Sequence, residues 1–180
     1  MKKNQKGFSL IELLIVVAII LIIAAIAVPN LLRSRMAANE ASAAGAERSI
    51  GTANVAYSST FNVGFAGVLS DLGPPAAAAP ATSAAADLLD SVLSGTLPVD
   101  PTPVKSGYTF TYTPLVAAPT STAPNGGFQV IAIPVASGST GQSTFCNDQT
   151  NVVLKDTTGT NPGAPSATGG CIQSATLIPM

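Results

Sequence analysis

The residues best suited to chemistry lie near the N-terminus, where one carboxylate interrupts an apolar run. Glu12 is followed by sixteen residues without a polar side chain, from Leu13 to Val28. A carboxylate within an apolar helix costs about 2.5–3.5 kcal/mol on membrane-insertion scales, so it is normally functional and paired with another group. Two interpretations follow. Glu12 either lies near the membrane interface and reaches water, or pairs with a cation at the same depth.

Gly7 offers a source for such a cation, because it is a small residue directly before the apolar run. Cleavage after Gly7 would give Phe8 a free α-amine, one helical turn from Glu12 in its own chain or closer in a neighbouring copy. An isolated ion pair is expensive in lipid. Pairing between chains would therefore favour the assembly of many copies.

The apolar run is long enough to cross a membrane. From Phe8 to Val28 there are twenty-one positions, interrupted only by Ser9 and Glu12. At about 1.5 Å per helical residue, they span roughly the 30 Å of a bilayer's hydrocarbon core. A secretory signal has an apolar core of about 7–15 residues with its cleavage site after that core. The segment therefore predicts an anchor that stays attached to the chain.

Basic residues around this helix indicate its orientation. Three lysines precede the apolar run, and two arginines follow it: Lys2, Lys3 and Lys6, then Arg33 and Arg35. By the positive-inside rule, the N-terminal end stays in the cytoplasm and the rest of the chain faces outward. We expect a single-pass inner-membrane precursor whose C-terminal domain lies outside the cytoplasm.

The stretch from Lys6 to Leu13 resembles the prepilin motif of the type IV pilin family, and the similarity continues to about Thr60. The resemblance implies cleavage after Gly7 by a prepilin peptidase on the cytoplasmic face, followed by N-methylation of Phe8. It also implies partners: copies of the same chain in an extracellular filament, the peptidase and methyltransferase, the inner-membrane assembly machinery, and membrane lipid before assembly.

The resemblance also implies specific roles for Glu12, Pro29 and the apolar helix. In that family, the glutamate at the position of Glu12 pairs with a neighbouring subunit's terminal amine during assembly. The proline at the position of Pro29 marks a bend in the helix, and the apolar helices bundle in the filament core.

Composition argues against several other functions. Only 9% of residues are charged and there is no histidine. Removing residues 1–7 takes away three of eight basic side chains and leaves five against nine acidic ones, a net charge of −4 before the termini. No basic stripe predicts nucleic-acid binding. No catalytic triad, metal cluster or phosphate-binding glycine motif is recognisable, so we expect neither an enzyme nor a cofactor or metal site.

The chain predicts an α+β fold in which a long N-terminal helix packs on a small antiparallel sheet, as in pilins. We expect the first helix to continue through 29–61, with alanines favouring helix and an apolar stripe facing the sheet. The stripe comprises Ala43, Ala46, Ile50, Ala53, Tyr57 and Phe61, with Glu40, Glu47 and Asn54 expected on the opposite side.

The predicted segments are a leader (1–7), a transmembrane and assembly helix (8–28), its continuation (29–61), a Pro/Gly/Ala-rich loop (62–106) and the sheet with its C-terminal loop (107–180). Within the loop, Ser83 and Gly95 are expected to cap a short helix. Strands are expected at 108–112, 128–133, 142–146 and 151–155, where apolar or aromatic residues recur between turn residues.

Cys146 and Cys171 are the only cysteines. The outward orientation puts them in an oxidising compartment, where they can form one intramolecular disulfide. Free thiols are the alternative. A bond would stabilise the fold by roughly 3–4 kcal/mol in the chain-entropy model, and it resembles the disulfide that closes the C-terminal loop of type IV pilins.

Three functional hypotheses remain open. The first is a structural subunit of a type IV pilus, and the second is a pseudopilin of a type II secretion system. The third is a single-pass anchored binding domain that does not polymerise. The disulfide loop favours the first over the second, and the combination of Gly7, Phe8 and Glu12 disfavours the third.

Overall fold

A computed structural model describes residues 8–76, 79–97, 102–158, 170–171 and 177–180. The chain divides into two compact units, Met1–Arg35 and Met36–Met180. Helix α1, Leu10–Phe61, runs through both units. The long first helix of the prediction is therefore confirmed, including its continuation past Pro29.

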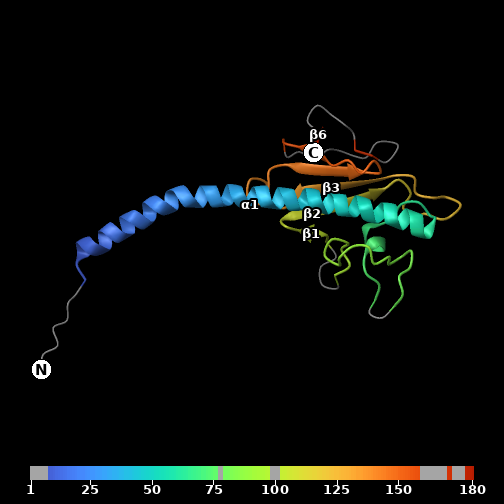
Figure 1. The fold of residues 1–180 in the computed structure, drawn as a ribbon, viewed down its shortest axis with the longest axis horizontal. Helices are drawn as coiled ribbons and strands as arrows, with labels where there is room; N and C mark the ends of the chain where they lie inside the picture. The colour runs from blue at the N-terminus through green and yellow to red at the C-terminus, as the bar shows by residue number, and fades with distance from the viewer. Residues whose placement is uncertain (1–7, 77–78, 98–101, 159–169, 172–176) are drawn as a thin grey trace, which may run out of the picture. The chain divides into compact units, whose positions relative to one another are not determined.

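The second unit contains a six-stranded antiparallel sheet with strands in sequence order. The strands are β1 (Val104–Lys105), β2 (Tyr108–Pro114), β3 (Phe128–Pro134), β4 (Thr144–Asp148), β5 (Leu154–Asp156) and β6 (Leu177–Pro179). Figure 1 shows the part of α1 in this unit running along one face of the sheet. The antiparallel meander and the α+β class are confirmed.

The core lies between α1 and the sheet face that it covers. Side chains alternate across a strand, so every second residue of β2 and β3 reaches the helix. Tyr108 and Phe110 of β2 join Val130 and Ala132 of β3 in one buried cluster with Ile50. The predicted stripe is buried from Ala43 to Tyr57, and Phe61 packs on it partly exposed.

Three polar residues of α1 lie on the sheet side, contrary to the prediction. Glu47 and Asn54 are fully buried, and Glu40 pairs with Lys155 at 3.0 Å and accepts hydrogen bonds from two backbone N–H groups before β4. The prediction assigned faces by polarity alone. Residues three apart share a helix face, so each of these residues lies beside the stripe residue three positions later.

Asn54 and Glu47 differ in how their polar atoms are satisfied. Asn54 Oδ1 accepts hydrogen bonds from the Ala66 N–H (3.1 Å) and the Tyr112 hydroxyl (3.0 Å). Neither side-chain oxygen of Glu47 has a hydrogen-bond partner among the described residues. Burial raises the pKa of Glu47 well above its usual value, and the nearby backbone of Ala132 lowers it only in part.

The predicted helix between Ser83 and Gly95 is wrong. The structure has turns there, and the short helix among the described residues of this loop region is the 3₁₀ helix η1, Leu69–Leu72. Asp87 takes a left-handed backbone conformation (φ 55°), which interrupts an α-helix. The Asp90 carboxylate accepts the N–H groups two and three residues later, an example of a local side-chain bond that competes with helix.

The edge strands β1 and β6 were not predicted, because each is only two or three residues long. β1 is joined to β2 by Ser106 and Gly107, both with positive φ (52° and 73°). Two such residues make the tight turn that fits the twist of a hairpin. The two later strands that were predicted, 142–146 and 151–155, begin two or three residues further along the chain as β4 and β5.

Candidate assembly segment and disulfide region

Glu12 is the third residue of α1, and its carboxylate turns back toward the start of the helix. Its Oε2 accepts a hydrogen bond from the Ser9 backbone N–H at 2.9 Å. The first N–H groups of a helix lack intrahelical partners, and negative charge is favoured at this end of the helix dipole. Glu12 therefore has a partner in its own chain that the sequence analysis missed.

The signal for this contact is in the sequence. Ser9 followed three residues later by Glu12 matches the capping-box pattern, in which the acidic side chain bonds the backbone N–H of the residue that precedes the helix. The structure shows that half of the pattern. Phe8, one residue before Ser9, is exposed over 84% of its surface, while Gly7 lies outside the described residues.

In the first unit, no described part of the chain packs on the apolar side chains of α1. Its most apolar 18-residue window has a mean hydropathy of 3.3, with none of it buried. Exposed side chains include Leu14, Ile19, Ile23, Ile26 and Val28. By length and composition this helix can cross a membrane, although an N-terminal signal sequence would pass the same test.

Pro29 lies inside α1, where it has no N–H to offer the preceding turn. The next residue, Asn30, donates a side-chain hydrogen bond to the Ile26 carbonyl at 3.0 Å. This side-chain contact supplies a donor in the turn that proline weakens. The bend expected at Pro29 stays a prediction.

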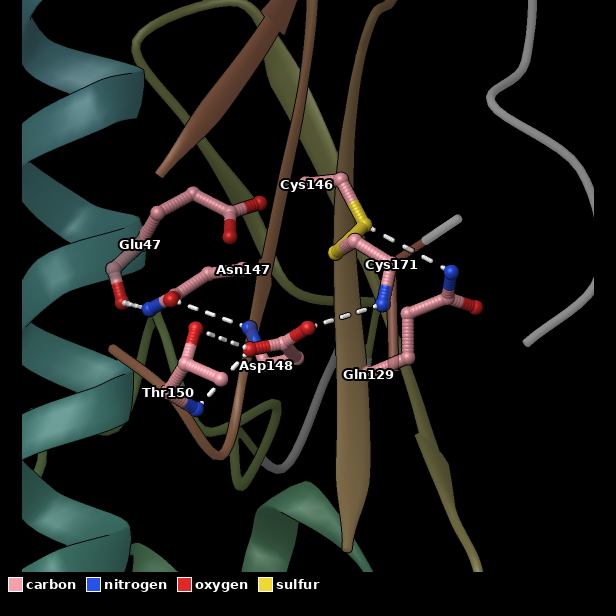
Figure 2. The surroundings of a disulfide bond; sticks show 7 residues. All are labelled: Glu47, Gln129, Cys146, Asn147, Asp148, Thr150 and Cys171. Atoms are coloured by element: carbon pink, nitrogen blue, oxygen red, sulfur yellow. Dashed lines mark hydrogen bonds between the residues drawn. A yellow bond between two sulfur atoms is a disulfide. The ribbon is translucent and has the colours of Figure 1, made fainter. Parts of the chain in front are cut away.

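The structure contains a disulfide between Cys146 and Cys171, with Cα atoms 6.1 Å apart. Cys146 is fully buried in β4, and the Gln129 side-chain amide of β3 donates to its sulfur at 3.5 Å. Figure 2 shows this amide and the Asp148 carboxylate on either side of the bridge. The bond fixes the chain near its C-terminal end to the middle of the sheet.

The acidic residues of this region are occupied by neighbouring donors. Asp148 accepts bonds from Thr150 and from the Cys171 N–H, and Asp156 accepts two from Thr158. Among the described residues, no group of three or more His, Cys, Asp or Glu residues could hold a metal ion. The two carboxylates organise turns within the chain.

Comparisons with known proteins point to the same N-terminal segment. Residues 2–28 match the family described as "Prokaryotic N-terminal methylation motif". A relative from Thermus thermophilus, described as "Type IV wide pilus major component PilA4", is 63% identical over 38 residues. Both findings support the resemblance of this N-terminal segment to type IV pilins.

The similarity to this pilin is confined to a minority of both chains. It covers 21% of this chain and 29% of the relative, and no solved structure matches the chain. The six-stranded sheet and the disulfide region are therefore described from this chain's own structure. Its fold, an apolar N-terminal helix packed on an antiparallel sheet, is pilin-like.

Proposed function

We propose that this chain is a structural subunit of a type IV pilus, cleaved after Gly7, methylated at Phe8 and polymerised through the apolar part of α1. One observation supports this most strongly. Glu12 places a carboxylate at the start of a helix whose apolar surface is uncovered, where it accepts the N–H of Ser9, the residue that follows Phe8.

The two oxygens of Glu12 have separate tasks in this proposal. Oε2 accepts the Ser9 N–H of its own chain, and the described residues give no partner to Oε1. A neighbouring subunit's terminal amine would bind at Oε1 and neutralise the carboxylate. Because a buried unpaired charge is strongly unfavourable, this pairing would select the register at which subunits join.

The membrane and then other subunits would cover the apolar helix in turn. In the precursor, lipid surrounds residues 8–28, Lys2, Lys3 and Lys6 remain cytoplasmic, and the sheet domain lies outside. The prepilin peptidase and methyltransferase would act at the cytoplasmic face. The inner-membrane assembly machinery would then transfer the subunit from lipid into an extracellular filament.

A pilus subunit is favoured over the two alternatives. The relative carries the description of a wide pilus component, and the C-terminal end is fixed by a disulfide, which favours a pilus over a secretion pseudopilus. An anchored domain that never polymerises would not need a carboxylate at Glu12, where it raises the cost of membrane insertion.

The test compares Glu12→Ala with Glu12→Gln in cells that make the fibres. Glutamine keeps an oxygen that can accept the Ser9 N–H but carries no charge, so it separates helix capping from charge pairing. We expect both variants to be processed and retained in the membrane, with sheared fibres reduced at least tenfold. Normal fibres from Glu12→Ala would contradict the proposed role, and normal fibres from Glu12→Gln alone would reduce that role to capping.

A further inference from the structure

A buried carboxylate lies beside the Cys146–Cys171 disulfide. Asp148 follows Cys146 by two residues in β4, so both side chains project from the same face of the strand. Only 8% of Asp148 is exposed. Its Oδ2 accepts the Cys171 N–H at 3.0 Å, while Oδ1 accepts the Thr150 N–H at 2.8 Å and hydroxyl at 2.6 Å (Figure 2).

We propose that Asp148 is a positioning residue for the disulfide: it holds the backbone of Cys171 against β4 so that the two sulfur atoms meet. The two Thr150 bonds fix the carboxylate within its own turn. The remaining oxygen then presents a charged acceptor to residue 171, 23 positions further along the chain. Hydrogen bonds to an ionised acceptor are about twice as strong as neutral ones.

The residue before Cys171 is Gly170, and its lack of a side chain leaves room for this contact. A Cβ atom on Gly170 would lie 2.9 Å from Asp148 Oδ2, too close for a carboxylate that is already held by three donors. Glycine therefore lets the chain approach the acceptor. On the other side of the bridge, Gln129 contacts the Cys146 sulfur, so each half-cystine has its own non-covalent support.

This contact raises the effective concentration of one thiol at the other. In glutathione buffer, the two thiols give up two protons and two electrons to oxidised glutathione, which becomes two reduced glutathione molecules, by exchange through a mixed disulfide. If Asp148 holds residue 171 in place, ring closure of the mixed disulfide costs less chain entropy. The exchange equilibrium then favours the protein disulfide.

The test measures this equilibrium constant in the full chain, purified in detergent and equilibrated with reduced and oxidised glutathione. Asp148→Asn keeps the shape but has only one oxygen, so the Cys171 N–H meets an amide donor if that oxygen stays with Thr150, or a weaker neutral acceptor if it does not. We expect the constant to fall about ten- to a hundredfold, as for loss of a hydrogen bond to a charged group. Thr150→Val removes the hydroxyl bond to Oδ1 but keeps the backbone N–H bond and the Cys171 contact, so it is the matched control and should lower the constant much less.

A second variant keeps the test decisive if Asp148→Asn does not fold. Gly170→Ala leaves the carboxylate intact but pushes residue 171 away, and should lower the constant in the same direction. A purely structural role would lower the free energy of unfolding of oxidised and reduced chains alike, without moving the constant. An unchanged constant in whichever of Asp148→Asn and Gly170→Ala folds, or an equal fall in Thr150→Val, would overturn the proposal. Since the assay does not require filaments, it stands apart from the proposed function.

Discussion

Along α1, the residues up to Arg35 expose their large apolar side chains, whereas the residues from Met36 on bury nine positions within their own unit. From Leu13 to Val28 the first part is apolar on all sides, whereas the second packs its stripe from Ala43 to Tyr57 on the sheet. A helix that is apolar all round needs lipid or other helices around it. The second part of this continuous helix packs on the sheet of its own chain. The first part requires lipid or other helices as its partner.

The carboxylates of the two parts show the same contrast. Glu12 is exposed and bonded to a backbone N–H at the helix start. Glu47 is fully buried, and its two oxygens have no hydrogen-bond partner among the described residues. Glu12 is therefore available to another molecule, whereas Glu47 affects only the stability of its own unit.

The largest change in the location of the protein is expected from placing the same charge on each part of the helix. Ile19 and Val55 are both 52% exposed, so their replacement by aspartate is a matched comparison. Ile19→Asp should add about 2.5–3.5 kcal/mol to membrane insertion and release much of the protein from the membrane fraction. Val55→Asp should leave membrane retention unchanged. Equal retention of both variants in carbonate-washed membranes would remove the distinction between the two parts.

Truncation of an isoleucine should lower the stability of the fold when it is made in the second part of the helix, and should leave that stability almost unchanged when it is made in the first. Ile50 is fully buried and Ile20 is 58% exposed. Ile50→Ala should lower the free energy of unfolding of the sheet unit by about 2–5 kcal/mol because it leaves a cavity. Ile20→Ala should change it by less than about 0.5 kcal/mol. Urea unfolding in detergent, followed by the fluorescence of the three tyrosines of this unit, Tyr57, Tyr108 and Tyr112, measures both, and similar shifts would contradict the assignment of the core.

Loss of the disulfide should affect only the second unit. Cys171→Ser opens a loop with a sequence separation of 25 and should lower the free energy of unfolding by about 3 kcal/mol in the chain-entropy model. Membrane retention should not change. Alkylation of the unreduced wild-type chain checks the premise: two reactive thiols would show that the bond is absent from the protein in solution.

The smallest effect concerns Glu47 and depends on pH. Because burial raises its pKa in the folded state, the folded chain binds this proton more tightly than the unfolded chain. The contribution to stability is full below the unfolded pKa, near 4.5, and is lost as pH rises toward the folded pKa. Glu47→Met should therefore stabilise the unit by about 1–3 kcal/mol at pH 8, with a smaller gain at pH 4. A gain independent of pH would show that Glu47 is not ionised by unfolding.

Much of this architecture follows from local sequence patterns. The apolar run, the stripe from Ala43 to Tyr57 and the alternation in β2 and β3 each reflect a single element's period, which a sequence displays directly. The faces of Glu40 and Glu47 were misjudged because polarity was given more weight than helical spacing. The burial of Glu47 beside the Ala132 backbone and the bonds of Glu40 to residues 142, 143 and 155 are contacts with distant parts of the chain, which no local pattern reveals.

The remaining differences arise from contacts between distant parts of the chain. The Asp148 bond to residue 171 and the pairing of β5 with β6 link positions more than twenty residues apart. Glu12 is a different case, since the Ser9 to Glu12 spacing was present and only its capping role was overlooked. The turn in place of the helix from Ser83 to Gly95 likewise reflects an aspartate that bonds its own backbone.

The central claim, that the apolar part of α1 holds subunits together after cleavage at Gly7, is tested most directly by the intact mass of the subunit in sheared surface fibres. We expect a mass equal to residues 8–180 plus one CH2 unit, for a methyl group that replaces a hydrogen, less two hydrogens for the Cys146–Cys171 bond. Fragmentation should place the methyl group on the Phe8 amine. A subunit beginning at Met1, or after Ala27 without the apolar helix, would contradict the claim.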